Sequence, residues 1–492
     1  MIGVGIYCRQ KARTVDDFVL GGRRVGPWLT AFAFGTSYFS AVIFVGYAGQ
    51  FGWNFGLAST WIGLGNAFIG SLLAWVILGK RTRVMTQSIN SKTMPDFFEK
   101  RFGSNKLKVV ASAIVFVFLI PYTASLYNGL SSLFNIAFEI PYWVCILAMA
   151  ILTGVYVVFG GYMATAINDF IQGIIMLVGI VSVVVAVLMQ NGGLGASVDK
   201  LASVAGEQYT SLGGPDVISL ITVVLLTSLG TWGLPQMIGK FYAIADDKAV
   251  KKGTIISTVF AVVVAGGCYF LGGFGRLFVS LGEGGKPVGG FDSVVPTMLS
   301  GLSPYIIGIV IVLVLSASMS TLSSLVLTSA STLTLDVFLP AFKKKEFAEK
   351  KKIITMRVLI VFFIILSALI AILKDTVLKD VAFIAQMMGI SWGALAGSFL
   401  APFLYGLYWK KTTRAAVWTS FGFGVTIMVV QLALSLCSAI PESGFFHFIV
   451  QNSLYTGVLA MLGGLVIVPV VSLMTQKSRP CNVEEIFTCY KK

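Results

Sequence analysis

The stretch Val223–Phe241 reads VVLLTSLGTWGLPQMIGKF and places Gly230, Gly233 and Pro235 in the middle of an apolar segment. Glycine destabilises a helix interior, and proline removes a backbone donor and clashes with the preceding turn. Such a break is tolerated in a membrane span only where it is buried in protein or lines a cavity. The stretch therefore predicts a broken span whose unwound middle borders a binding site.

A second stretch, PWLTAFAFGTSYFSAVIFVGYAGQFG at 27–52, shows a comparable interruption, with Gly35, Thr36 and Ser37 near its middle. We count these two segments as the first and sixth predicted spans. The sixth span comes five spans after the first. Because five is an odd number, spans 1–5 and 6–10 insert with opposite orientation, which predicts an inverted repeat. The alternative is that one or both interruptions are ordinary helix kinks.

The composition indicates a chain embedded in lipid. Of its 492 residues, 56% are hydrophobic and 12% charged, whereas about 25% charged residues is typical of soluble domains. The apolar residues form runs of roughly 20 to 28, each able to cross about 30 Å of hydrocarbon. We expect an all-α polytopic membrane protein with spans at 27–56, 57–79, 107–136, 141–159, 163–190, 217–245, 253–281, 299–335, 354–373, 381–409, 413–437 and 452–476.

The net charge of +15 follows from where the basic residues lie, and we do not expect a nucleic-acid partner. If the first span runs outward, all but a few of the 36 Lys and Arg fall on the inner side. The outer ones are Lys200, Arg276, Lys286, Lys374 and Lys379. By the positive-inside rule, the basic loops and the C-terminal tail are expected in the cytoplasm of a cell with this protein in its plasma or inner membrane.

The predicted spans divide the chain into six segments. These are a remnant of an N-terminal span with an inner loop, a five-helix repeat, an outer loop, an inverted five-helix repeat, two accessory spans and a cytoplasmic tail, at 1–26, 27–190, 191–216, 217–409, 410–476 and 477–492. The chain starts with MIGVGIYC, which is too short to cross a bilayer and meets basic residues at once. We therefore expect a truncated N-terminal helix.

Signatures of enzymes are missing from the sequence. It contains no GxxxxGK[ST] phosphate loop, no HExxH and no GxSxG, and no inner segment long enough for a kinase or ATPase domain. We expect a protein that is not an enzyme and has no cofactor. An ion gradient would then supply its energy, since one charge crossing 100 mV releases about 2.3 kcal/mol.

The eighth span carries a run of hydroxyl side chains, SASMSTLSSLVLTSASTLT at 316–334. Ala317, Ser320, Thr321 and Ser324 follow helical spacing and share one face. Hydroxyl and carbonyl oxygens suit hard cations, and unwound carbonyls of the first span would complete the ligand set. The alternative is that these small residues only allow close helix packing.

Acidic residues within spans are candidates for function, because burying a charge in lipid is costly. Asp169 lies in the fifth span, where it can neutralise a cation, relay a proton, or only cap a helix near the inner surface. We expect Asp336, at the inner end of the eighth span, to be interfacial. No Lys or Arg lies at the middle of a predicted span, so no buried cation that would hold a substrate carboxylate is expected.

Five segments together resemble the sodium/solute symporter family, which includes carriers of proline, pantothenate, sialic acid, sugars and monocarboxylates. They are TVDDFVLGGRRVGPWLTAFA, TMPDFFEKRFGS, GGYMATAINDFIQG, LSASMSTLSSLVLTSASTLTLDVF and GLYWKKTTRAA. The resemblance covers nearly the whole chain. It implies the leucine-transporter-like fold of two inverted five-helix repeats, with two extra C-terminal helices, and sodium as the coupling ion.

The resemblance also implies residues for the ions. One sodium would bind through the backbone carbonyls of Thr36, Phe39 and Ala317 and the hydroxyls of Ser320 and Thr321. Some members hold a second sodium with an aspartate of the fifth span and serines of the eighth, which match Asp169, Ser323 and Ser324.

The solute is less sharply indicated. Polar and aromatic residues at central depth give the candidate contacts Tyr38, Ser40, Tyr122, Thr231, Trp232 and Gln386. The proline carriers have an aromatic residue in the sixth span where this chain has Thr231, whereas Tyr122 matches their tyrosine. Short stretches look most like the pantothenate carriers.

We therefore expect a sodium-coupled symporter that imports a small pantothenate-, monocarboxylate- or amino-acid-like solute by alternating access. Its expected partners are that solute, sodium and the lipid bilayer. The alternatives are a proton-coupled symporter of the same fold that uses Asp169, a sodium/sugar symporter, a passive channel and a non-transporting membrane sensor. A channel would need a continuous polar pore, and a sensor would normally carry a large inner signalling domain.

Overall fold

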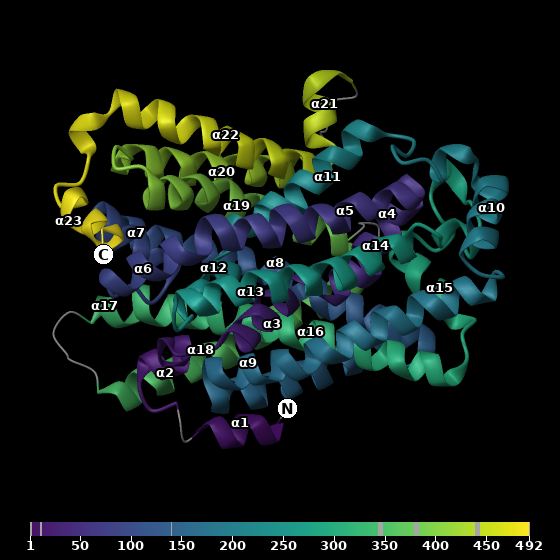
Figure 1. Cartoon of the computed structure of the whole chain (residues 1–492), viewed down its shortest axis with the longest axis horizontal. Coiled ribbons are helices and arrows are strands. Elements are labelled where there is room, and N and C mark those ends of the chain that lie inside the picture. The colour runs from purple at the N-terminus through teal and green to yellow at the C-terminus, as the bar shows by residue number, and fades with distance from the viewer. Residues whose placement is uncertain are drawn as a thin grey trace.

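The structure, a computed structural model, describes residues 2–9, 12–138, 140–342, 348–377, 383–437 and 443–491. Within these ranges the regular elements are all helices, apart from two isolated bridges, Val25 with Ile244 and Leu281 with Pro287. The long helices run along one common direction and form a single bundle (Figure 1). The expectation of an all-α chain is confirmed.

The predicted break in the first span is present, a few residues later than expected. Helix α3 (Pro27–Tyr38) ends at Phe39, whose backbone is extended, and the helix resumes in η2 (Val42–Tyr47) and α4 (Ala48–Phe55). Gly35 lies inside the helix and allows α3 to approach the helix that carries Phe260 closely. A Cβ at this position would lie 2.5 Å from the Phe260 ring.

The sixth span is broken where the sequence predicts. Helix α11 (Val217–Leu229) passes into the 3-10 turn η7 (Gly230–Gly233), and α12 (Pro235–Tyr242) follows at a bend of 47°. Leu234 between them is extended, and Pro235 starts α12 at a position where its missing N–H costs nothing.

Two helical segments are too long for one crossing. Val42–Ser88 has 47 residues and Tyr142–Gln190 has 49. At 1.5 Å per residue each would be about 70 Å long as one straight helix, whereas the hydrocarbon of a bilayer is about 30 Å thick. Each contains a glycine at positive φ, Gly56 (φ 60°) and Gly161 (φ 56°), where the chain turns. These turns separate the first predicted span from the second and the fourth from the fifth.

The remaining described helices complete the bundle. Before the sixth span they are α1 (Ile2–Arg9), α2 (Val15–Leu20), η1 (Gly21–Arg23), η3 (Gly56–Ser59), α5 (Thr60–Gly65), η4 (Asn66–Leu73), η5 (Trp75–Gly79), α6 (Lys80–Ser88), α7 (Met94–Phe102), α8 (Asn105–Phe138), α9 (Tyr142–Gln190), α10 (Leu194–Ala205) and η6 (Glu207–Tyr209). After it come α13 (Asp247–Ala261), η8 (Val262–Gly266), α14 (Gly267–Gly272), η9 (Gly275–Leu277), η10 (Glu283–Gly285), η11 (Phe291–Ser293), α15 (Val294–Ser300), α16 (Pro304–Thr332), η12 (Leu333–Phe338), α17 (Leu339–Ala341), α18 (Glu349–Val377), α19 (Phe383–Tyr408), α20 (Arg414–Leu436), α21 (Gly444–Val450), α22 (Ser453–Met474), η13 (Gln476–Ser478), α23 (Val483–Phe487) and η14 (Thr488–Tyr490).

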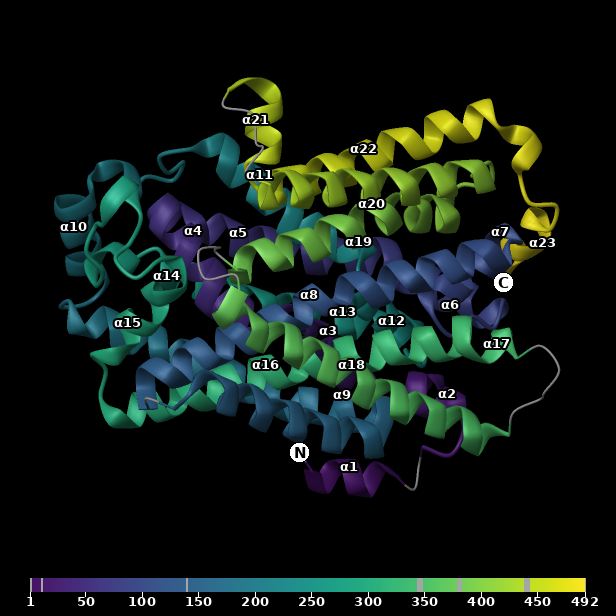
Figure 2. The ribbon, with the colours of Figure 1, turned by 180° about the vertical axis from the view of Figure 1, so that it is seen from behind.

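By length and composition, nine helical segments of the described residues are able to cross a membrane, and the bent pair α11–α12 makes a tenth. Helices α20 and α22 lie along one edge of the bundle in both views and pack on α19 (Figure 2). This placement fits two accessory helices outside a central core.

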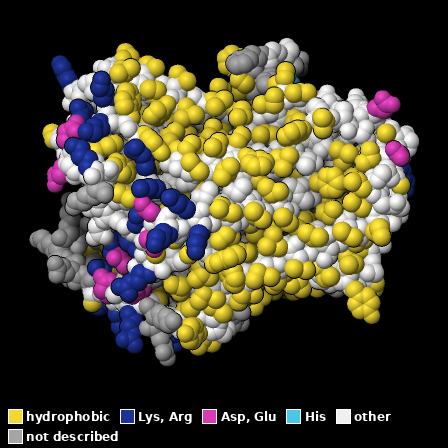
Figure 3. Space-filling view, in the orientation of Figure 1, with side chains coloured by type: hydrophobic (Ala, Val, Ile, Leu, Met, Phe, Trp, Pro, Cys, Tyr) yellow, Lys and Arg dark blue, Asp and Glu magenta, His cyan; other side chains and the backbone are white. Residues whose placement is uncertain are grey.

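Most charged side chains on the face shown in Figure 3 lie at one end of the bundle. Lys and Arg gather at the end that holds α6, α7, α17 and α23, and a broad hydrophobic band covers the middle of the molecule (Figure 3). The predicted outer residue Lys379, the first two residues of the predicted span 381–409 and residues 343–347 of a basic loop lie outside the described residues. The hydrophobic band is the surface that lipid would cover.

Candidate functional site

The break after α3 meets the middle of α16 in a cluster of five oxygen atoms. The Ser320 hydroxyl donates to the Thr36 and Ala317 carbonyls at 3.2 and 3.1 Å. The Thr321 hydroxyl lies 3.1 Å from the same two carbonyl oxygens and 3.3 Å from that of Phe39. The structure thus brings together all five residues that the sequence proposes for the first sodium.

Local backbone geometry frees these carbonyl groups. The Phe39 N–H makes the last helical hydrogen bond of α3, to Gly35, and the chain then becomes extended. The carbonyls of the last turn of a helix lack partners within the helix. Those of Thr36 and Phe39 therefore accept hydroxyl groups from α16, and the same lone pairs are available to a cation.

The cluster suits a small hard cation by its chemistry. Its atoms are neutral hydroxyl and carbonyl oxygens, which are hard ligands, and its five residues are at most 1% exposed. Each hydroxyl oxygen also has lone pairs that turn toward a cation when its hydrogen rotates away. The described residues hold no group of three or more His, Cys, Asp or Glu side chains that would suit a multivalent metal.

A buried cation lies within the predicted sixth span, near the end of that span. Lys240 on α12 is 4% exposed, and its ammonium nitrogen lies 3.7 Å from a carboxylate oxygen of Asp169, which is fully buried on α9. The same ammonium group donates to the Ser324 hydroxyl at 2.9 Å. Lys240 is therefore the charged group that sequence reasoning missed at this position.

The missed signal was present in the sequence. Lys240 lies inside the predicted span 217–245, five residues after Pro235, but it was counted with the charges of the inner side. Lys240 reaches Asp169 on α9 and Ser324 on α16 in the bent arrangement of the sixth span. The spacing of residues in the sequence does not give the angle of that bend. A lysine that follows a helix break within a predicted span therefore indicates a possible ion pair with an acidic residue of another span.

The other residues of the proposed second sodium position differ in their contacts. Ser324 also shares a hydrogen bond of 2.8 Å with the Ser37 hydroxyl on α3. Ser323 instead donates to the Ser320 carbonyl of its own helix at 2.8 Å. Asp169 and Ser324 are therefore joined through Lys240, and the pair is linked onward to the break in the first span.

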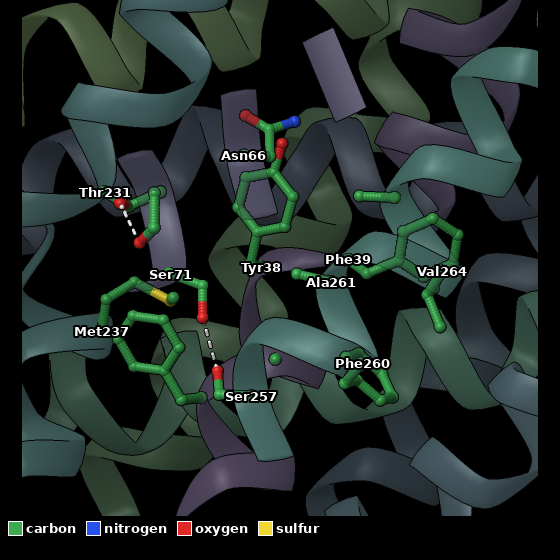
Figure 4. A pocket seen from close by; sticks show the side chains of 14 residues that line it. Tyr38, Phe39, Asn66, Ser71, Thr231, Met237, Ser257, Phe260, Ala261 and Val264 are labelled. Carbon is green, nitrogen blue, oxygen red and sulfur yellow. Dashed lines mark hydrogen bonds between the residues drawn. The ribbon is translucent and has the colours of Figure 1, made fainter. Parts of the chain in front are cut away.

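A small pocket lies beside the break in the first span, between α3, η4, η7 and α13 (Figure 4). Its volume of about 10 Å³ is roughly the space that one water molecule needs. Tyr38 and Thr231 line it, together with Asn66 and aromatic side chains that include Phe260. The pocket is much too small for an organic solute, so a solute can bind here only when these helices move apart.

The other predicted solute contacts lie around this pocket at different distances. The ring of Tyr122 lies 6.0 Å from that of Trp392, which in turn is 5.8 Å from the Tyr38 ring. Trp232 donates its indole N–H to the Ile69 carbonyl at 3.0 Å and does not line the pocket. Gln386 is half-buried, and its carbonyl accepts from Ser453 on α22.

Several polar atoms in this region are buried without a hydrogen bond among the described residues. They are the hydroxyls of Tyr38, Ser40 and Tyr122, the amide nitrogen of Asn66 and the indole nitrogen of Trp392. Buried polar atoms are nearly always paired, and each exception needs an explanation. Tyr38 and Asn66 line the pocket, and the Trp392 and Tyr122 rings follow behind Tyr38, so a polar ligand that entered here would find groups able to hydrogen-bond to it.

Asp336, expected at the inner interface, is 2% exposed. Its carboxylate accepts a hydrogen bond of 2.6 Å from Thr93, the residue that caps the start of α7. The side chain is buried because η12 packs against α8 and α18 and meets Thr93 at the start of α7, a segment far away in the sequence.

Comparison with known proteins gives consistent matches. A family model described as Sodium:solute symporter family matches residues 18–424. The osmoregulated proline transporter OpuE of Bacillus subtilis is 27% identical over 481 residues, 97% of this chain and 93% of the relative. The sodium/proline symporter of Staphylococcus aureus (strain JH9) is 30% identical over 443 residues, 88% of this chain and 84% of the relative.

Solved structures share the fold at low identity. A Na+-coupled sialic acid symporter in a substrate-bound outward-open state superposes with a TM-score of 0.76 at 18% identity, over 96% of this chain and 95% of that chain. Mhp1, a nucleobase-cation-symport-1 family transporter, gives 0.50 at 13% identity, over 95% and 98%. The predicted leucine-transporter-like fold is confirmed.

Proposed function

The chain belongs to the sodium:solute symporter family, and from that premise we propose that it couples the entry of sodium to the import of a small organic solute. The observation that carries this proposal is the cluster of five buried oxygens between α3 and α16. The proposed ligands of one sodium are the carbonyls of Thr36, Phe39 and Ala317 and the hydroxyls of Ser320 and Thr321.

Sodium at this position would act as a clamp between two parts of the bundle. Its proposed ligands come from the broken first span and from α16, so its binding favours the arrangement in which these elements are in contact. The proposed solute position lies on the other side of the same break, beside Tyr38. Because both ligands would favour one arrangement of the break, each raises the affinity for the other.

We propose that the solute is small and carries a carboxylate, in the class of amino acids, pantothenate and monocarboxylates, with proline as the first candidate. The names of the two bacterial relatives support proline. The unpaired hydroxyls of Tyr38, Ser40 and Tyr122 and the nitrogens of Asn66 and Trp392 would bind its polar groups. Thr231, whose hydroxyl donates to Ser228 and Gly70, is the point where this chain departs from the proline carriers.

We propose a location in the plasma or inner membrane with the basic end of the bundle in the cytoplasm. The gathering of Lys and Arg at the end with α6, α7 and α23 supports this orientation (Figure 3). Sodium and solute would then enter from the end that holds α10 and α15, and leave beside α12.

The test is uptake by the purified full-length chain in proteoliposomes. Radiolabelled proline, pantothenate, lactate and glucose are each offered with an inward sodium gradient, with potassium in place of sodium, and with an inward proton gradient. We expect one of the carboxylate solutes to accumulate above its outside concentration only with sodium.

Each other outcome rejects part of the proposal. Accumulation driven by the proton gradient and insensitive to sodium would establish proton coupling. Accumulation of glucose alone would establish a sodium/sugar symporter. Equilibration without accumulation would establish a passive pathway and reject coupled transport.

A further inference from the structure

Four side chains from four different spans form a connected chain beside the sodium cluster. Ser37 on α3 shares a 2.8 Å hydrogen bond with Ser324 on α16, Ser324 accepts from Lys240 on α12 at 2.9 Å, and Lys240 pairs with Asp169 on α9 at 3.7 Å. All four are at most 4% exposed. The ammonium group therefore lies between the carboxylate and the serine hydroxyl that a second cation would need.

The surroundings of Lys240 hold its charged end in this position. Its nitrogen also lies 5.3 Å from the centre of the Tyr162 ring, a favourable distance for a cation over an aromatic face. The neighbouring pocket, lined by Lys240 and Ser324 among others, has a volume of about 50 Å³. The side chain thus has room at one side, but its three donors face a hydroxyl, a carboxylate and a ring.

The charges at this position already balance. One buried carboxylate faces one buried ammonium group, and the described residues hold no group of three or more His, Cys, Asp or Glu side chains. A sodium ion added here would leave one positive charge without a partner in a medium of low dielectric, which is strongly unfavourable. A second ion and the lysine therefore exclude each other.

We propose that the Lys240 ammonium group is a tethered cation that occupies the second cation position, so that the protein binds one sodium ion per transport cycle and not two. The inference rests on the proposed sodium-coupled function. It assigns Asp169 and Ser324 to Lys240 instead of to an ion. It also makes Lys240 a positioning residue, which connects the half-helix after the break in the sixth span to the ion cluster through Ser324 and Ser37.

The experiment compares the wild-type chain with Lys240→Met, which keeps the length of the side chain and removes its charge. The double variant Lys240→Met/Asp169→Asn removes both charges, and Lys252→Met changes an exposed lysine on the neighbouring helix α13. Purified proteins are titrated with sodium in potassium-balanced buffer without solute. The readouts are the rise of the thermal midpoint with the logarithm of sodium concentration and, in proteoliposomes, the ratio of sodium flux to solute flux.

We expect the wild type, Lys252→Met and the double variant to behave as proteins with one sodium. In Lys240→Met the carboxylate of Asp169 loses its partner, and sodium takes the place of the ammonium group. The slope of the thermal midpoint against the logarithm of sodium should therefore be about twice that of the wild type. The flux ratio should rise from one towards two sodium ions per solute.

The failures of the two proposals differ in this experiment. A wild type without any sodium response would reject the proposed function and this inference together. A wild-type flux ratio of two would reject only the inference. An unchanged slope in Lys240→Met, or a Lys240→Met protein that stays unfolded at high sodium, would show that sodium does not replace the ammonium group and would also overturn the inference.

Discussion

The hydroxyl oxygen of Thr321 lies 3.1 Å from the carbonyl oxygen of Thr36, and 3.3 Å from that of Phe39. One side chain of α16 thus contacts both the last turn of α3 and the first extended residue after it. No charged group takes part in this contact. These oxygen atoms are therefore available to coordinate a cation, because coordination of a hard cation is stronger than the weak neutral hydrogen bonds that it would replace.

The first prediction concerns this contact. Thr321→Ala removes one of the proposed sodium ligands, and we expect the sodium concentration for half-maximal uptake to rise about tenfold, which corresponds to about 1.4 kcal/mol. The measurement is initial uptake of solute by proteoliposomes at a series of sodium concentrations. The maximal rate at saturating sodium should change much less.

Two variants control for nonspecific effects on α16. Thr321→Ser keeps the hydroxyl and should keep the sodium dependence of the wild type. Ser329→Ala removes a buried hydroxyl that has no hydrogen bond among the described residues, two turns further along the same helix, and should also leave it unchanged. Equal sodium dependence in Thr321→Ala and the wild type would remove this hydroxyl from the ion site.

The parts of the fold that follow from local residue chemistry were predictable. Gly230, Gly233 and Pro235 mark the break in the sixth span because their effect on a helix is intrinsic. The break in the first span was predicted near Gly35, but the helix continues through that glycine, which packs closely against Phe260. The helix ends at Tyr38, and Phe39 is extended. The repeat boundaries at 27–190 and 217–409 stay predictions.

The parts that depend on tertiary contacts were not predictable from residue spacing. Lys240 is buried because the bend at η7 turns α12 against α9, which brings it to Asp169. Asp336 is buried because the start of α7 covers it. In both cases the side chain gains a partner more than 70 positions away in the sequence, and a single sequence carries no signal for such a pairing.

The second prediction concerns the solute position. The Tyr122 hydroxyl is fully buried beside the Ser40 hydroxyl and the Trp392 indole nitrogen, so Tyr122→Phe removes a polar group at the proposed solute position. In the protein without solute, the thermal midpoint should change by no more than the loss of one weak neutral hydrogen bond explains, about 1 kcal/mol. The KM for solute should rise about fivefold, as expected for the loss of a hydrogen bond of about 1 kcal/mol.

Tyr127→Phe is the matched control for this change. Tyr127 lies on the same helix and is also fully buried, but its spacing of five residues from Tyr122 places it on another side of α8, away from the Trp392 ring that Tyr122 contacts. Its substitution should affect stability in the same way and leave KM unchanged. If both variants change KM equally, Tyr122 has no special role in solute binding.

The third prediction concerns the basic end of the bundle, where α7 meets the end of α19. Arg101 on α7 is fully buried, and its guanidinium donates to the carbonyls of Gly406 at 2.9 Å and Trp409 at 3.2 Å, at the end of α19. Lysine cannot reproduce two such bonds in a planar fork. Arg101→Lys should therefore lower the free energy of unfolding by about 2 kcal/mol, measured as a lower thermal midpoint in detergent.

Uptake by Arg101→Lys distinguishes an effect on stability from an effect on sodium coupling. Because Arg101 contacts neither the ion cluster nor the pocket, the sodium dependence of uptake per folded molecule should equal that of the wild type. Lys106→Ala, at an exposed position at the start of α8, should change neither quantity. A shifted sodium dependence in Arg101→Lys would indicate that α7 takes part in coupling.

The last prediction tests the broken sixth span. Gly233 allows η7 to touch α19: a Cβ at this position would lie 2.7 Å from the Cα atom of Ala396 and 3.0 Å from Leu400. Gly233→Ala forces these elements apart, and overpacking of this kind costs about 1–3 kcal/mol. We expect a lower thermal midpoint and a loss of uptake that exceeds what the reduced amount of folded protein explains.

Gly239→Ala gives the opposite expectation within the same span. A Cβ at Gly239 would meet no atom within 4 Å, and the residue lies inside helix α12. Replacing glycine by alanine in a helix interior stabilises by about 0.5–1 kcal/mol, so the thermal midpoint should rise slightly and uptake should persist. If both alanine variants transport normally, close contact between η7 and α19 is not needed for transport, and the break acts only through the backbone groups that it exposes.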